Sequence, residues 1–244
     1  MGRRRRACVI AALMCLWLAA PVDAQTDRRW SVAATMGVPG PGPAADLEAA
    51  MRASGFDRPG GGCVFGLCFP IAENPRSTTG LNRSAGYPFA VQVNREWSAR
   101  GVGLSFVVAR TPLGRTSGVH APLTNLAIDY AVDSVGFIAT LERRGFGVGA
   151  GPAWHVARVR DADPQFGAGP WRRHSRLGAF AQARMMVPAR SRFFLDVSGQ
   201  YRYVGAIDVG PLAPHAILEP AAIFPRSSAS FNHWLVAIGV GVRF

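Results

Sequence analysis

The chain has 244 residues, of which 49% are hydrophobic and 17% are charged, and its formal net charge is +12. This charged fraction lies well below the roughly 25% of soluble domains, which argues against an ordinary cytosolic enzyme. The normal apolar content excludes a disordered chain. All 27 basic side chains are arginines, which on charge alone favours a nucleic-acid partner. No nucleic-acid-binding motif accompanies the charge, so we expect no nucleic acid to be bound.

Residues 1–24 have the three parts of a secretory signal peptide, and we expect them to be cleaved. A run of four arginines is followed by an apolar stretch of 14 residues, after which Pro21 and a small-x-small sequence lead to Ala24. Fourteen apolar residues are short for a membrane span, so a retained anchor is the weaker alternative. Cleavage lowers the net charge to +9, because the segment contains four arginines and Asp23.

The remaining residues, 25–244, form one predicted domain in which apolar residues alternate with polar or small ones. A period of two is typical of β-strands. The pattern predicts eight strands, at about 29–38, 87–97, 101–111, 125–142, 146–158, 172–187, 192–207 and 230–244. The fourth strand changes its apolar parity halfway along, which predicts a β-bulge near Asp133 and Ser134.

The predicted connections alternate in length. Three are tight and contain arginine, at 98–100, 143–145 and 188–191, and four are long, at about 39–86, 112–124, 159–171 and 208–229. An even number of antiparallel strands, with short turns at one end and long loops at the other, is the layout of an outer-membrane β-barrel. The predicted fold class is therefore all-β: a transmembrane, antiparallel, up-and-down barrel of eight strands.

Aromatic residues gather at two heights of the predicted strands. The girdle at the short-turn ends comprises Trp30, Trp97, Phe146, Phe193 and Phe244, and the girdle toward the long loops comprises Tyr87, Trp154, Tyr203 and Trp234. Ten tilted strand residues rise roughly 25 Å, the height of the apolar band of such barrels. The alternative is a water-soluble sandwich or lipocalin-like barrel. It would turn the glycine-rich faces at 147–151 and 239–241 toward water, whereas small residues suit the crowded lumen of eight strands.

In these features the chain resembles the small eight-stranded outer-membrane barrels of the OmpA/OmpX-like family, over about residues 29–244. The most specific feature is the last strand, which alternates regularly and ends on Phe. In the family such a strand looks like the signal that the barrel-assembly machinery reads, and its residues here are Trp234, Val240, Val242 and Phe244. The resemblance implies the outer membrane of a Gram-negative-type bacterium, and we expect a monomer.

Cys63 and Cys68 remain after cleavage of the signal peptide, and they flank four residues in the long first loop, 39–86, which we expect to be extracellular. In an oxidising compartment such a pair favours a local disulfide. A metal site would need further ligands, and no histidine lies within fifty residues of either cysteine. Redox-active pairs are usually separated by two residues rather than four. We expect no metal and no cofactor.

Charged residues on the predicted inward faces indicate a lumen filled by polar side chains. They are Glu96, Asp129, Asp196, Arg184 and Arg202. Because a buried charge is costly unless it is paired, we expect arginine–carboxylate pairs that link the strands. A narrow or gated solute pore is the alternative, although eight strands leave little more room than side chains occupy.

The sequence contains no arrangement that favours catalysis. His174 and Ser175 are neighbours on a strand and point to opposite faces, so they are poorly placed as a base and a nucleophile. We predict that the chain is not an enzyme, and a lipid A-modifying activity is the remoter alternative. The predicted role is a structural or surface-interaction function in the cell envelope.

Two features bear on partners. The loops at 39–86 and 208–229 are unusually apolar, and they either cover the barrel mouth or contact a partner or lipid. Arg172, Arg173 and Arg176 are expected near the outer rim, where arginines bind anionic headgroups. Outer-membrane lipid or lipopolysaccharide is therefore an expected partner, beside the barrel-assembly machinery.

Overall fold

The computed structural model describes residues 30–56, 60–64, 67–71, 75–79, 87–97, 101–120, 124–162, 168–189, 191–212, 215–216 and 224–244. It describes the backbone alone at 60–64, 67–71, 79, 119–120, 124–125 and 215–216. The predicted signal peptide, residues 1–24, lies outside the described residues.

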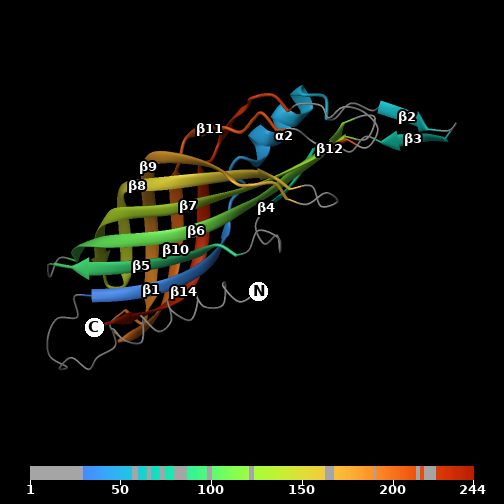
Figure 1. Cartoon of the computed structure of the whole chain (residues 1–244). Helices are drawn as coiled ribbons and strands as arrows, with labels where there is room; N and C mark the ends of the chain where they lie inside the picture. The colour runs from blue at the N-terminus through green and yellow to red at the C-terminus, as the bar shows by residue number, and fades with distance from the viewer. Residues whose placement is uncertain are drawn as a thin grey trace.

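The described residues are mostly β-structure (Figure 1). The long strands are β1 (Trp30–Pro39), β5 (Phe89–Glu96), β6 (Val102–His120), β7 (Thr124–Arg143), β8 (Phe146–Asp161), β9 (Arg172–Val187), β10 (Phe193–Tyr203) and β14 (His233–Arg243). The short strands are β2 (Gly60–Val64), β3 (Leu67–Ile71), β4 (Arg76–Thr79), β11 (Ala206–Asp208), β12 (His215–Ala216) and β13 (Ser228–Ser230). The helix is α2 (Ala44–Ala53). Within the described part of the chain, no helix has the length and apolar character needed to cross a membrane.

The eight long strands of the described chain close into a ring. They pair antiparallel in the order β1, β5, β6, β7, β8, β9, β10 and β14, and β14 pairs again with β1. At the seam, Trp30 and Phe244 exchange both backbone hydrogen bonds, at 3.2 and 3.0 Å. The ring therefore has no free edge. The prediction of an eight-stranded, up-and-down barrel is confirmed.

A tight turn joins β7 to β8 at the end of the ring where β1 begins and β14 ends. Arg144 and Gly145 connect β7 to β8 with φ values of 53° and 82°, the left-handed conformation that a two-residue hairpin uses. Gly101 precedes β6 with a φ of 79°, and a Cβ there would lie 1.6 Å from the carbonyl oxygen of Glu142. Both its conformation and this close backbone approach require glycine at 101.

β6 and β7 extend past the rest of the ring as a paired hairpin, up to the pair His120–Thr124. The prediction of a long loop at 112–124 is therefore wrong for most of that segment. The segment remains a strand because it has partners on both sides: β7 pairs with its whole length, and β4 pairs with Gly114–Ser117. β4 belongs to the first long loop, so local sequence does not reveal this partner.

The predicted bulge lies in a different strand. The register between β6 and β7 shifts between Pro112 and Gly114, whereas the pairing of β7 with β8 keeps one register past Asp133 and Ser134. Proline has no N–H group to donate to a β-ladder, which explains why the irregularity falls beside Pro112.

The change of apolar parity in β7 reflects a change of surroundings. Val135 and Phe137 face outward from the ring and are 41% and 52% exposed. Ile128 and Tyr130, further along β7, face inward and are completely buried. The strand itself continues without a bulge, but its apolar residues first face the inside of the mouth and then the outside of the ring.

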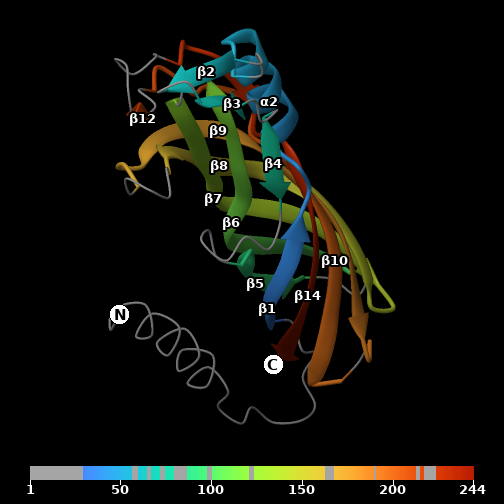
Figure 2. The same ribbon diagram turned by 90° about the vertical axis from the view of Figure 1, so that its right-hand side faces the viewer.

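The mouth at the far end of the ring is covered by the first and last long connections. β4 pairs with β6 and β12 pairs with β7, so the hairpin extension becomes a four-stranded sheet. α2 lies over this end, opposite the end where β1 starts (Figure 2). One apolar core joins α2, the extension and the connection between β10 and β14; its largest members are Leu47, Met51, Phe56, Tyr130, Phe224 and Phe231.

Candidate functional site: lumen, mouth and outer surface

Two ion pairs occupy the lumen near the short-turn end. Arg184 on β9 donates from Nη2 to Oδ2 of Asp196 on β10 over 2.6 Å, and the two side chains are 3% and 2% exposed. Arg243 on β14 lies 3.3 Å from Glu142 on β7, and its guanidinium stacks 4.7 Å from the ring centre of Phe194. Arg243 and Glu142 are absent from the predicted set, although their alternation with neighbouring residues places them on the inward faces.

Arg202 lies deeper in the lumen and is fully buried. Its Nη2 donates to Gln200 Oε1 over 2.9 Å, its Nη1 donates to Thr111 Oγ1, and the ring centre of Phe180 lies 5.1 Å from its guanidinium carbon. Within the described chain these neutral groups, and no carboxylate, hold the arginine. The expected arginine–carboxylate pairing therefore does not apply to Arg202.

Asp129 lies outside the lumen, contrary to the prediction. It shares a face of β7 with the outward residues Val135 and Phe137, because the strand continues without a bulge. Its partners are Arg115 on β6 at 2.7 Å and Arg160 on β8 at 2.9 Å. The predicted bulge placed it on the inward face, so this error follows from the error in register.

Hydrogen-bonded polar side chains fill the lumen on the β1, β5 and β6 side. Gln92 donates to Asn94 Oδ1 over 2.7 Å, Asn94 donates to Ser31 Oγ over 3.0 Å, and Ser105 donates to the same Asn94 oxygen. All four are at most 8% exposed. Glu96 follows at the end of β5, where the same inward face reaches the short turns.

The mouth is covered by apolar packing and by contacts between the described parts of the two connections. Leu47 and Met51 of α2 are fully buried. Asp46, in the first turn of α2, accepts the backbone N–H of Ser230 over 2.7 Å, and no side chain caps the start of α2. Asn232 accepts the N–H groups of Val204 and Gly205 at 2.8 Å each. The apolar loops were expected either to cover the barrel mouth or to contact a partner or lipid. Their described parts cover the mouth.

The outside of the ring carries an apolar band. Leu177, Phe193 and Val240 are 73%, 70% and 67% exposed, and alternate residues on every ring strand behave similarly. The aromatic residues of the predicted girdles are all 40% exposed or more, apart from the half-buried Phe244; they are Trp30, Trp97, Phe146, Phe193, Tyr87, Trp154, Tyr203 and Trp234. A closed ring that is apolar outside and polar inside is suited to a bilayer and not to water.

The protein is an eight-stranded outer-membrane β-barrel. Barrels of this kind have short periplasmic turns and longer extracellular loops, and the end of this barrel that α2 covers is the end with the long connections.

No family model and no curated protein sequence matches the chain. Among solved structures, the barrel is similar to the outer membrane protein AlkL, at 14% identity and a TM-score of 0.46 over 92% of this chain and 94% of that one. OprG from Pseudomonas aeruginosa follows at 10% identity and 0.42, covering 88% and 95%. Ail of Yersinia pestis, solved with the heparin analogue sucrose octasulfate, has 12% identity and 0.37, covering 88% and 97%. At these identities the likeness concerns the fold alone.

Cys63 and Cys68 face each other in the register of β2 and β3. Opposite residues of an antiparallel pair have Cα atoms about 4.5–5.5 Å apart, which lies within the range that a disulfide spans. Their side chains lie outside the described part of the structure, so the disulfide stays a prediction.

A serine and a histidine meet in the lumen. Ser134 Oγ lies 2.8 Å from His155 Nδ1, a contact between cross-strand partners that only the register of β7 with β8 reveals. Both residues are at most 1% exposed. Among the described residues, no group of three or more His, Cys, Asp or Glu is placed to hold a metal ion.

Proposed function

We propose that this outer-membrane barrel is a closed, non-enzymatic protein with a structural or surface-interaction role in the cell envelope. The observation that carries the proposal is the apolar core at the mouth. Leu47, Met51 and Phe224, contributed by the first and last long connections, are completely buried against the extension of β6 and β7. The mouth is thereby closed by a folded layer whose outer surface is what the protein presents to its surroundings.

The lumen supports the same proposal. The Arg184–Asp196 pair and the fully buried Arg202 lie at different heights inside the ring. Opening a path would separate Arg184 from Asp196, and breaking a buried ion pair of this kind costs about 3–5 kcal/mol. A narrow solute pore is therefore the weaker candidate.

We also propose how the barrel reaches and occupies the membrane. The residues of the expected assembly signal, Trp234, Val240, Val242 and Phe244, lie on the outward-facing side of the last strand, where a partner can reach them during insertion. All eight ring strands are paired on both sides, which favours a monomer. Outer-membrane lipid or lipopolysaccharide is the proposed surrounding partner, and no role for nucleic acid is proposed.

Planar-bilayer recording of the refolded mature chain tests the closed barrel. Heat-modifiable gel migration first shows that the sample is folded, and an open porin in the same bilayer shows that the assay detects conductance. We expect no channel steps from the protein. Reproducible single-channel steps at moderate voltage would contradict the closed barrel.

The proposed envelope role and the proposed absence of enzymatic activity are tested in cells. We expect deletion of the gene to change outer-membrane permeability to a hydrophobic dye or to change surface adhesion, and expression of the wild-type chain to restore the original state. The mass spectrum of lipid A should be identical with and without the gene. A shifted acyl-chain or phosphate pattern would point to the lipid-modifying alternative.

A further inference from the structure

A cluster of charged residues lies on the outside of the barrel, just above the upper aromatic girdle. Its members come from β6, β7, β8 and β9, and we call it the outer rim cluster: Arg110, Arg115, Arg158, Arg160, Arg173, Asp129 and Asp133. Asp133 is shared by Arg158 at 3.0 Å and Arg110 at 4.0 Å, and Asp129 is shared by Arg115 and Arg160. Five arginines against two aspartates leave three positive charges in excess.

The fold holds these charges together although they repel one another. Arg158 lies directly opposite Arg173 in the register of β8 with β9, a placement that is unfavourable for like charges. Trp171 fixes the orientation of Arg158 and Arg160, whose guanidinium carbons lie 5.2 and 4.5 Å from its ring centre. Within the described chain, Arg110 makes one ion-pair contact, at 4.0 Å, and its side chain is 58% exposed.

Arg158 lies above the girdle, outside the membrane-spanning part of β8. Burial lowers the pKa of its guanidinium, Asp133 raises it, and the neighbouring arginines lower it again. Its Nε is buried and has no hydrogen-bond partner within the described chain. An added anion would therefore relieve repulsion that Asp133 alone does not balance.

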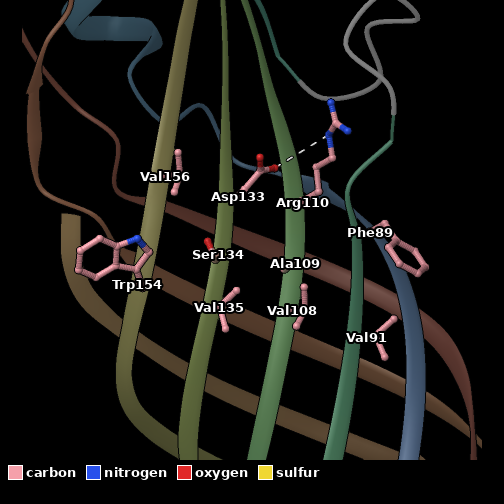
Figure 3. A pocket seen from close by; sticks show the side chains of 10 residues that line it. All are labelled: Phe89, Val91, Val108, Ala109, Arg110, Asp133, Ser134, Val135, Trp154 and Val156. Atoms are coloured by element: carbon pink, nitrogen blue, oxygen red, sulfur yellow. Dashed lines mark ion pairs between the residues drawn. The ribbon is translucent and has the colours of Figure 1, made fainter. Parts of the chain in front are cut away.

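An apolar groove runs down the outer surface of the barrel directly below this cluster. It has a volume of about 340 Å³, and its walls are side chains from β5 to β8: Phe89, Val91, Val108, Val135, Trp154 and Val156. Arg110 and Asp133 stand at its upper end (Figure 3). Phe89, Val108 and Trp154 are 42%, 45% and 53% exposed, so the groove opens toward the lipid.

We propose that the outer rim cluster and this groove form a binding site for one outer-leaflet lipid, the phosphorylated lipid A portion of lipopolysaccharide. The phosphate sits against Arg110, Arg158 and Arg173, and an acyl chain lies in the groove. Charge complementarity and height select this occupant: the cations lie at headgroup level, and the apolar walls continue into the hydrocarbon region. The site deepens the proposed partnership with outer-membrane lipid and rests on it.

Native mass spectrometry of the refolded mature chain in phosphatidylcholine nanodiscs, titrated with bisphosphorylated lipid A, tests the site. The variant Arg110→Ala/Arg173→Ala removes two cations and leaves the Arg158–Asp133 pair in place. We expect its apparent affinity to be weaker by about tenfold or more, because charge-assisted contacts are lost. Arg95→Ala is the matched control: Arg95 lies on the outside of β5 near the short turns, over Trp30, and its loss should change binding by less than about twofold.

A second variant examines the groove. Val91→Trp keeps the outer surface apolar and fills the groove, so lipid A binding should weaken while heat-modifiable migration stays normal. Dephosphorylated lipid A should bind more weakly than the phosphorylated lipid, and millimolar inorganic phosphate should not displace it. Equal binding by the wild-type chain and Arg110→Ala/Arg173→Ala, equal binding of dephosphorylated lipid, or displacement by free phosphate would each overturn the proposal. Conductance is measured on the same preparations, so that a failure of the proposed lipid A site can be distinguished from a failure of the proposed closed barrel.

Discussion

The Arg184–Asp196 pair in the lumen offers the sharpest test of how the barrel is held together. The two groups meet at 2.6 Å and are 3% and 2% exposed, so water screens neither charge. Asp196→Ala leaves the guanidinium of Arg184 buried without its carboxylate. Breaking one side of a buried pair costs about 3–5 kcal/mol, and we expect the free energy of unfolding to fall by that amount.

Removing both charges should cost much less. Asp196 Oδ1 and Arg184 Nε have no hydrogen-bond partner within the described chain, so the pair does not fully recover its desolvation energy. For such pairs, apolar replacement is often neutral or stabilising. The double variant Arg184→Met/Asp196→Leu should therefore unfold within about 1 kcal/mol of the wild type, although each single variant is strongly destabilised.

Urea unfolding of the chain folded into lipid vesicles, followed by tryptophan fluorescence and gel migration, measures these differences. The control is the exposed pair of α2, in which Arg52 lies 3.3 Å from Glu48 one helical turn away. Glu48→Ala should cost less than about 0.5 kcal/mol. A cost below about 1 kcal/mol for Asp196→Ala, or a double variant as unstable as the sum of the singles, would refute the reasoning.

Three further predictions concern the mouth, a turn and the cysteines. Met51→Asp places a charge in the core over the mouth and should lower the stability of that core by about 3 kcal/mol or more. Added protease should then cut α2, while the ring keeps its heat-modifiable gel migration. Gly101→Ala forces a Cβ against the backbone of Glu142 and should lower the free energy of unfolding in urea by about 2–4 kcal/mol. Alkylation of the exported, denatured chain should find no free thiol at Cys63 or Cys68, and reduction should cost about 2 kcal/mol.

Each of these has an internal control. Ala49 is exposed on α2, so Ala49→Asp should leave protease resistance unchanged. A Cβ added at Gly199 would meet no neighbouring atom within 4 Å, so Gly199→Ala should cost less than about 1 kcal/mol. Cys63→Ser should expose one reactive thiol. Equal protease sensitivity of the two α2 variants, equal urea midpoints of the two glycine variants, or two thiols in the untreated chain would contradict the respective prediction.

Residues that face lipid can be predicted from sequence because their surroundings are uniform. Outward positions at the height of the apolar band share the same surroundings, so alternation and aromatic spacing predict strands such as β9 and β14 closely. Above the band this rule fails. Ile128 and Tyr130 lie in the core over the mouth, to which α2 contributes Leu47 and Met51. That helix lies about eighty residues earlier in the chain, so the periodicity of β7 does not indicate it.

Alternation, connection lengths and aromatic spacing were enough to define the class of the protein: an eight-stranded outer-membrane barrel with an apolar outside and a polar lumen. Which charges meet was decided by strand register. Asp129 moved from the predicted lumen to the outer rim, because the irregularity beside Pro112 sits in β6 and leaves β7 continuous. The three-dimensional arrangement also decided that the mouth is covered and that arginines from three strands, β6, β8 and β9, gather above one outer groove. Alternation depends on local contacts, whereas register and closure depend on pairing between segments far apart in the chain.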